Sequence, residues 1–297
     1  MKRYINLLFV LLLFCSGCEL YTQDEYEEYI VVESYLVANG TLPNVLLSHT
    51  TPIEEEYSFQ DTAIEGAEVQ VRRLNADSSI IETFEYKQVN PGIYEPVLSH
   101  TVLDQQLYEL YIQTNSGETV KAQTYVPGNF ETVNRDQIKD GYVYQSEEQV
   151  QLKVTPSEYP GRQTFYFFTV NVSADADLRL TPFYADLVEN QDADTANFYI
   201  NSSNIVNEGN YNQNQDGTIS LNLPWISIAF YGRNTIIANA IDDNMYDFLR
   251  SQSVQTGGST LSPGEIQNID YNVEGGIGIF GSMASDTVLV NILEPQQ

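Results

Sequence analysis

Short stretches in which apolar and polar residues alternate run through most of the chain. Clear examples are IVVESYLVANG at 30–40, IEGAEVQVRRL at 64–74 and LYELYIQT at 107–114. A period of two places every second side chain on one face, so each stretch predicts a half-buried β-strand. Turns such as Asn115-Ser116-Gly117 separate them, which is typical of antiparallel sandwiches. Residues 29–127 therefore predict one Ig-like or transthyretin-like β-sandwich.

Strand patterns continue beyond Pro127-Gly128, so residues 128–297 predict a second, C-terminal β-rich domain. Its strands are expected in EQVQLKVTP (148–156), TFYFFTVNVS (164–173), TISLNLPWISIAF (218–230), NTIIANAI (234–241), NVEGGIGIFGS and TVLVNIL. A polar insertion, 174–218, interrupts them and contains candidate strands at 183–188 and 197–203. The fold class is thus all-β, with two antiparallel β-sandwich-like domains in tandem.

One short helix is expected near the C-terminus, at about 242–252. Asp242 and Asp243 are good residues for a helix start, and Met245, Phe248 and Leu249 follow at helical spacing. No other segment has a sustained helical period.

The N-terminus has the features of a secretory signal. Lys2 and Arg3 precede an apolar run that ends at Phe14, which is shorter than the ~20 residues a membrane helix needs. Small residues then lead to Cys18, and this ending resembles a bacterial lipobox. The resemblance implies a signal peptide at 1–17, cleavage before Cys18 and lipidation of that residue. The alternative is an ordinary signal that leaves Cys18 as a plain thiol.

Composition and charge limit the class of protein. A hydrophobic content of 42% and 21 tyrosines indicate a folded protein. The formal net charge of −28 excludes nucleic acid as a partner, because little could neutralise phosphates. The same charge would repel an anionic lipid surface, so a lipid anchor must provide the membrane attachment.

Residues 18–28 are expected to form an acidic tether between the anchor and the folded body. They contain five acidic residues and no basic one: Glu19, Asp24, Glu25, Glu27 and Glu28. The cluster resembles the signal by which lipoproteins of the phylum Bacteroidota reach the outer face of the outer membrane. We therefore expect an outer-membrane, lipid-anchored protein that is exposed on the cell surface.

Four features in order resemble one Bacteroidota outer-membrane lipoprotein family, catalogued as domain of unknown function 4249. They are the lipobox, VVESYLVANG, the GAEVQV strand with its Pro-Gly-x-Tyr turn, and the C-terminal helix followed by NVEGGIGIFGS. The resemblance implies an accessory role beside a TonB-dependent outer-membrane receptor. It provides no catalytic residue.

Glycines near the C-terminus spell GxGxxG, from Gly276 through Gly278 to Gly281, with Gly275 before them. In a dinucleotide site the motif would open a helix within a βαβ unit, whereas the remaining residues predict a strand. We interpret the motif as a structural glycine strand packed against another backbone.

Two sets of residues are candidate cation ligands. Asn212, Asn214 and Asp216, followed by Gly217, resemble the first half of an EF-hand loop, but Leu223 stands where the bidentate Glu belongs. A polar hairpin turn is the alternative, and no cofactor is expected unless this loop binds calcium. His49 and His100 could share copper or zinc only if they were adjacent in the fold.

Threonines in Asp-Thr-aliphatic motifs are candidate O-glycosylation sites, by resemblance to exported Bacteroidota proteins. They are Thr62, Thr195 and Thr287. Trp225 follows Pro224 in an apolar stretch and is either core or an aromatic binding platform.

The prediction is a non-enzymatic accessory subunit of a TonB-dependent receptor in nutrient capture or uptake. The alternative is a stand-alone surface module that binds glycans or cations. A hydrolase is the third hypothesis, and no GxSxG motif or carboxylate-pair pattern favours it.

Overall fold

The computed structural model describes residues 26–162, 164–172, 178–206, 212–253 and 268–295. Cys18 and the predicted signal peptide lie outside these residues. Most of the regular structure is strand, so the fold is all-β. The strands are β1 (Ile30–Val37), β2 (Val45–His49), β3 (Glu68–Leu74), β4 (Ile80–Asn90), β5 (Ile93–Pro96), β6 (Leu107–Gln113), β7 (Thr119–Tyr125), β8 (Tyr142–Val143), β9 (Gln151–Val154), β10 (Phe165–Val172), β11 (Ile200–Ser202), β12 (Asn212–Gln213), β13 (Ile219–Asn222), β14 (Gly232–Ile241) and β15 (Ile277–Leu293).

Helical segments are few within the described residues. The α-helices are α2 (Pro182–Gln191) and α3 (Asp243–Ser253), and the 3₁₀ segments are η2 (Arg135–Gln137), η3 (Thr195–Phe198) and η5 (Trp225–Ser227). α3 corresponds to the predicted helix at 242–252. Asp242 precedes it and accepts a hydrogen bond of 2.9 Å from the backbone N–H of Met245, as an N-cap does.

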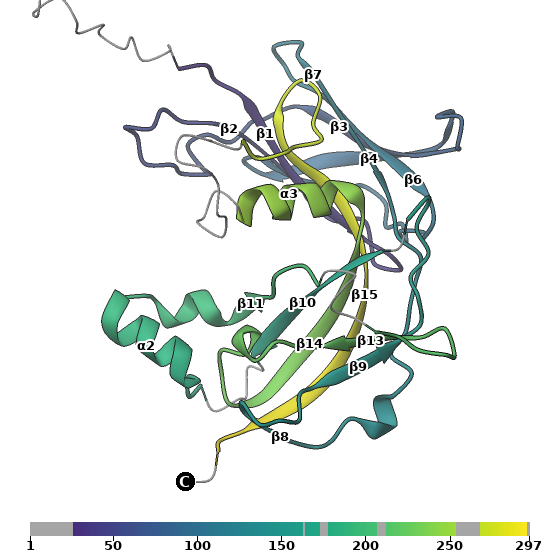
Figure 1. The fold of residues 1–297 in the computed structure, drawn as a ribbon. Helices are drawn as coiled ribbons and strands as arrows, with labels where there is room; N and C mark the ends of the chain where they lie inside the picture. Colours follow the sequence, from purple (N-terminus) through teal and green to yellow (C-terminus); the bar gives the residue numbers. More distant parts are fainter. Residues whose placement is uncertain (1–25, 163, 173–177, 207–211, 254–267, 296–297) are drawn as a thin grey trace, which may run out of the picture.

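Twelve strands form one long curved sheet, in the order β11-β10-β14-β15-β1-β2-β5-β4-β3-β6-β7, with β8 paired to the end of β15 (Figure 1). The other three strands form a small sheet in the order β12-β13-β9. β10 lies between β11 and β14, which agrees with its near-continuous apolar sequence.

β15 joins the two halves of the chain. Its first part pairs in parallel with β1, from Val31↔Ile277 to Val37↔Met283, and its second part pairs antiparallel with β14. The sheet is therefore mixed, and the two C-terminal strands that we expected separately are one strand of 17 residues. The division at Pro127-Gly128 stays a prediction, and the pairing of β1 with β15 runs across it.

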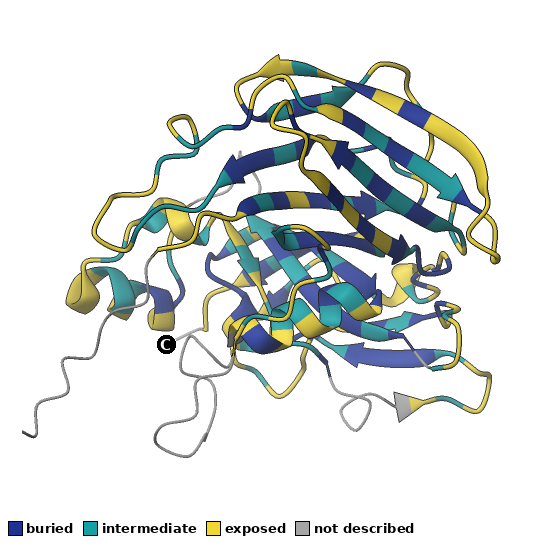
Figure 2. Ribbon diagram, turned by 90° about the horizontal axis from the view of Figure 1, so that it is seen from above, coloured by how far each residue is buried: buried dark blue, intermediate teal, exposed yellow. Residues whose placement is uncertain are grey.

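The hydrophobic core also extends through both halves. One cluster of buried residues includes Val32 and Leu110 from the N-terminal strands and Phe168 and Val290 from the C-terminal ones. Figure 2 shows the alternation of buried and exposed residues along the N-terminal strands. The alternating pattern of the sequence corresponds to the side of each strand that faces this core.

Close contact between backbones explains the glycines at the start of β15. Gly278 has a φ of 108°, and an added Cβ there would lie 2.1 Å from the carbonyl oxygen of Val32. An added Cβ at Gly276 would lie 2.7 Å from the carbonyl oxygen of Ile30, and one at Gly275 would lie 2.4 Å from that of Thr119. Only glycine fits such positions. Gly281 differs, because its added Cβ would meet the side chain of Met245 on α3.

The prediction of a strand at 183–188 is wrong, because these residues lie in α2. Pro182 is at the first helical position, where its fixed φ suits a helix start. Tyr184 and Leu187, three residues apart, pack against Phe230 in a small cluster. The expected strand at 197–203 is shorter than predicted, with η3 before β11, and the strand expected at 218–230 ends at Asn222, before Pro224 and η5.

Candidate functional site

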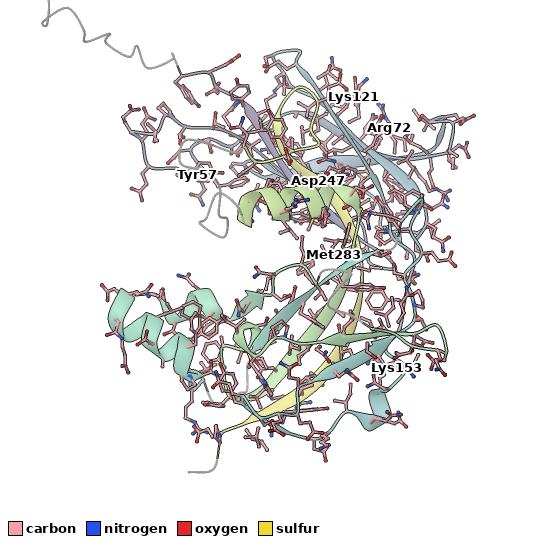
Figure 3. All side chains as sticks on the ribbon, viewed as in Figure 1. Tyr57, Arg72, Lys121, Lys153, Asp247 and Met283 are labelled. Atoms are coloured by element: carbon pink, nitrogen blue, oxygen red, sulfur yellow. The ribbon has the colours of Figure 1, made fainter. Side chains whose placement is uncertain are left out.

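A cleft of about 1300 Å³ lies between α3 and the strands opposite it. α3 and β11, which both contribute to its lining, face each other in Figure 1, and Figure 3 labels Met283 of the lining and Asp247 on α3. The lining comes from β1, β10, β11, the residues that follow β11, α3 and β15. It consists of Glu33, Tyr35, Phe167, Thr169, Ile200, Ser202, Ser203, Asn204, Ile205, Tyr246, Leu249, Arg250, Gln252 and Met283.

Apolar side chains hold α3 over the sheet. Met245 of α3 is buried together with Phe167, Ile241 and Ile279, one from each of three neighbouring strands. Tyr35, Leu249 and other half-buried residues pack around this cluster. Phe167 of this cluster and its neighbours Tyr35, Leu249 and Met283 line the cleft, so they give it an apolar wall.

Stacked rings also hold α3 in position over the sheet. The rings of Phe165 in β10 and Tyr246 in α3 are parallel within 18° at a centroid distance of 4.0 Å. Arg162 lies over Phe165, with its guanidinium carbon 4.3 Å from the ring centroid, and Arg250 lies 6.0 Å from that of Tyr246. Cation–π and stacking contacts of this kind stabilise one position of the helix.

The N-terminus of α3 rests on a buried polar network. Thr124 Oγ1 of β7 lies 2.5 Å from Asp242 Oδ2 and 2.7 Å from Ser282 Oγ of β15, and Ser282 donates to the carbonyl oxygen of Tyr125. Thr124 has one hydroxyl hydrogen for two contacts. When Asp242 is ionised, Thr124 donates to its Oδ2; when Asp242 is protonated, it donates to Thr124, and Thr124 then donates to Ser282.

Burial raises the pKa of Asp242 to about 6, and the hydrogen bonds from Thr124 and the backbone only partly oppose this. The raised pKa means that Asp242 takes up a proton at a higher pH than an ordinary aspartate does. This network connects β7, α3 and β15, and so both halves of the chain.

Polar groups line the part of the sheet farther from α3. Asn239 Nδ2 donates to Thr169 Oγ1 at 3.0 Å, and Ser285 Oγ donates to Asn239 Oδ1 at 2.7 Å. Glu33 and Arg250 are the two charged residues of the lining. Burial, with the carboxylate of Glu33 as a further cause, raises the pKa of Tyr35, so its hydroxyl remains a neutral donor.

The candidate calcium residues lie in a hairpin between β12 and β13. Asp216 Oδ2 accepts a hydrogen bond of 2.7 Å from Lys153 Nζ, and Oδ1 accepts from Thr218. Hydrogen bonds from Lys153 and Thr218 lower the pKa of Asp216. Asn214 donates to Thr218 and Ser220, and Asn212 pairs with Ser220 in the ladder. Calcium at this turn would have to compete with an ammonium group for the carboxylate.

The two histidines do not face each other across one site. His49 ends β2 and lies 3.6 Å from Glu28, whereas His100 stacks on Phe84 at 4.0 Å. The carbonyl of His100 accepts from Leu42, which precedes the opposite end of β2. Within the described ranges, no three His, Cys, Asp or Glu side chains gather where they could hold a metal ion.

The candidate glycosylation sites differ in exposure. Thr287 is exposed in β15, whereas Thr62 and Thr195 are half-buried. Thr62 Oγ1 donates to the carbonyl of Ser58 at 2.9 Å. Trp225 is packed against the core, and its Nε1 donates to the carbonyl of Ser146.

Sequence reasoning missed the cleft residues. The predicted helix at 242–252 was the one sequence feature that pointed to this part of the molecule. Most other lining residues lie in or next to strands, and their alternating pattern is the same as that of any half-buried sheet.

No curated protein matches the chain. Solved structures that resemble it include Escherichia coli alpha-2-macroglobulin activated by porcine elastase, at 9% identity and a TM-score of 0.21, over 73% of this chain and 18% of that one. Trypsin-activated alpha-2-macroglobulin from the same organism gives a TM-score of 0.22 at 9% identity, over 73% and 14%. The chain thus spans less than a fifth of these proteins.

A third similar structure contains the three N-terminal domains of the bacteriophage RB49 Highly Immunogenic Outer Capsid protein, at 9% identity and a TM-score of 0.21, over 91% of this chain and 71% of that one. The family comparison is more specific, because one family model matches residues 19–288. The chain belongs to the family described as domain of unknown function DUF4249.

Proposed function

We propose that this protein is a lipid-anchored, non-enzymatic accessory subunit of a TonB-dependent receptor at the outer membrane, and that its cleft binds the ligand to be captured or delivered. The observation that carries the binding role is the cleft itself. It has about 1300 Å³ of space, a mainly apolar wall and polar groups at its edges. Large concave sites of this composition are typical of ligand binding.

Sequence features support the proposed lipid-anchored location at the outer membrane. Cys18 follows the apolar segment as in a lipobox, and no helix in the described residues is long and apolar enough to cross a membrane. The acidic body would be repelled by anionic headgroups, so attachment depends on the lipid. The receptor as partner comes from the family resemblance.

The anchor is tested by replacing Cys18 with alanine and fractionating cells. Cys15→Ala, three residues upstream, is the matched control, because it removes a thiol from the same segment and keeps the proposed lipidated residue. We expect C18A to leave the membrane fraction and C15A to remain there. A C18A protein that pellets with membranes like wild type would contradict the anchor.

The partner is tested by purification through a C-terminal tag in mild detergent. We expect one β-barrel receptor to copurify with the wild-type protein and to be reduced with C18A, because the anchor holds both proteins in one membrane. Recovery of no barrel protein would contradict the accessory role.

A stand-alone glycan-binding or cation-binding module is the second candidate. The aromatic residues Tyr35 and Tyr246 beside polar Ser202 and Asn204 favour glycan binding, since sugars stack on rings and need hydrogen bonds. A glycan array and thermal shifts with calcium separate the candidates. A pure docking subunit should respond to neither.

A further inference from the structure

One edge of the long sheet opens into the cleft. β11 is the terminal strand of the sheet and pairs only with β10 in the strand order. The backbone N–H of Val172 donates to Tyr199, and that of Ser203 donates to Phe168, with Ser202 opposite Thr169. Alternation along an antiparallel pair then directs the N–H and C=O groups of Ile200 and Ser202 away from β10.

These edge groups have no main-chain partner within the described part of the chain. Ile200 and Ser202 are also exposed, with Ile200 at 67%. β11 has neither a charged residue nor a proline, the usual means by which proteins protect a free edge.

Contacts on the other face hold this edge in place. Asn201 donates to the carbonyl of Ser227 at 2.9 Å and to the hydroxyl of Tyr184 in α2. Ser203 Oγ accepts from the backbone N–H of Phe168 at 2.8 Å. The edge is therefore preorganised, which lowers the entropy cost of binding there.

The cleft has room for the side chains of an added strand. Ile200, Ser202 and Asn204 line the cleft beside Leu249 and Tyr246 of α3. A strand paired to β11 would direct every second side chain to the cleft side of the sheet. Hydrogen bonds between the two main chains would provide affinity. The lining of the cleft would determine which side chains fit at alternate positions of the added strand.

The charge of the protein restricts the charge of the segment that can bind. The lining has one acid and one base, Glu33 and Arg250, whereas the whole chain carries a formal charge of −28. The body would repel an acidic segment and attract a basic one, and a neutral segment would meet no such repulsion.

We propose that the cleft binds an extended polypeptide segment, which adds as a strand to the free edge of β11 and inserts alternate apolar side chains beneath α3. This inference rests on the proposed role of the cleft as a binding site and names the class of its ligand.

The test uses the full-length chain in detergent and a phage-displayed library of random peptides, each roughly nine residues long, enough for one strand. Ser202→Pro removes an outward N–H and no bond to β10, so the fold should persist, which a melting curve checks. Ser202→Ala is the matched control, because it keeps the N–H. We expect wild type and S202A to enrich peptides with apolar residues at alternate positions.

An enriched peptide is then synthesised with and without N-methyl groups on alternate residues. We expect the S202P substitution to weaken peptide binding by roughly tenfold or more, and N-methylation of the peptide to have an effect of the same size. Each change removes one or more main-chain hydrogen bonds between β11 and the peptide.

Equal binding of the N-methylated peptide, equal binding by S202P, or no enrichment on wild type would overturn the proposal. A glycan that binds the cleft while no peptide does would also overturn it. Copurification of a receptor with S202P as with wild type would leave the accessory role standing.

Discussion

A buried carboxylate at the start of α3 connects three elements of the molecule. Asp242 is fully buried and contacts Thr124 and the backbone of Met245. Its pKa is about 6 in the folded protein, above the ordinary value of 3.8. The folded state therefore binds the proton more tightly than the unfolded state, and this contribution to stability is full at low pH and lost as pH rises through 6.

We expect Asp242→Asn to remove this dependence while it keeps a good N-cap. Relative to D242N, wild type should lose on the order of 2 kcal/mol of unfolding free energy between about pH 4 and about pH 7. Urea unfolding of both proteins across this range measures it. A difference that does not change with pH would contradict the raised pKa.

Gly278 provides a second prediction for a single residue. Gly278→Ala places a Cβ 2.1 Å from Val32 O, in the contact between β15 and β1. Gly117→Ala is the matched control, because Gly117 also has a positive φ but has no atom within 4 Å of its added Cβ. We expect about 1 kcal/mol of destabilisation for G117A and more than about 3 kcal/mol for G278A, measured by urea unfolding. Similar losses of unfolding free energy in the two variants would show that the close contact at Gly278 adds no destabilisation.

At the scale of elements, α3 should depend on its stacking against β10. Phe165→Ala, Tyr246→Ala and the double variant form a cycle that isolates the contact between the rings, which are 4.0 Å apart. We expect a coupling of about 0.5–1.5 kcal/mol in the unfolding free energy. A coupling near zero would mean that the rings do not hold the helix.

Strands and the C-terminal helix were predictable from sequence because their patterns are local. IVVESYLV alternates as β1 does, and Asp242 marks the start of α3. α2 was mistaken for a strand because 183–188 is a short stretch rich in aromatic and aliphatic residues. The spacing of three between Tyr184 and Leu187 fits a helix, and both pack on Phe230. The cleft was not predictable, because residues as distant in sequence as Tyr35, Ile200 and Met283 meet only through the strand order.

At the scale of the whole molecule, the two halves should unfold together. β1 pairs with β15, Lys121 pairs with Glu274, and one core cluster includes residues of both halves. We expect calorimetry of the intact protein to show one transition. A fragment of residues 29–127 should not fold by itself, because β1 then lacks β15. A cooperative transition of that fragment would instead support an independent N-terminal domain.

The parallel pairing of β1 with β15 also sets the order in which the chain can fold. A ribosome makes β1 among the first strands and β15 last, so nearly the whole chain must be synthesised before the two can meet. Contacts between segments so distant in sequence form slowly, and an unpaired strand invites aggregation until they do. The newly made N-terminal half must therefore be shielded, by a chaperone or by rapid completion of synthesis, until its final strand arrives.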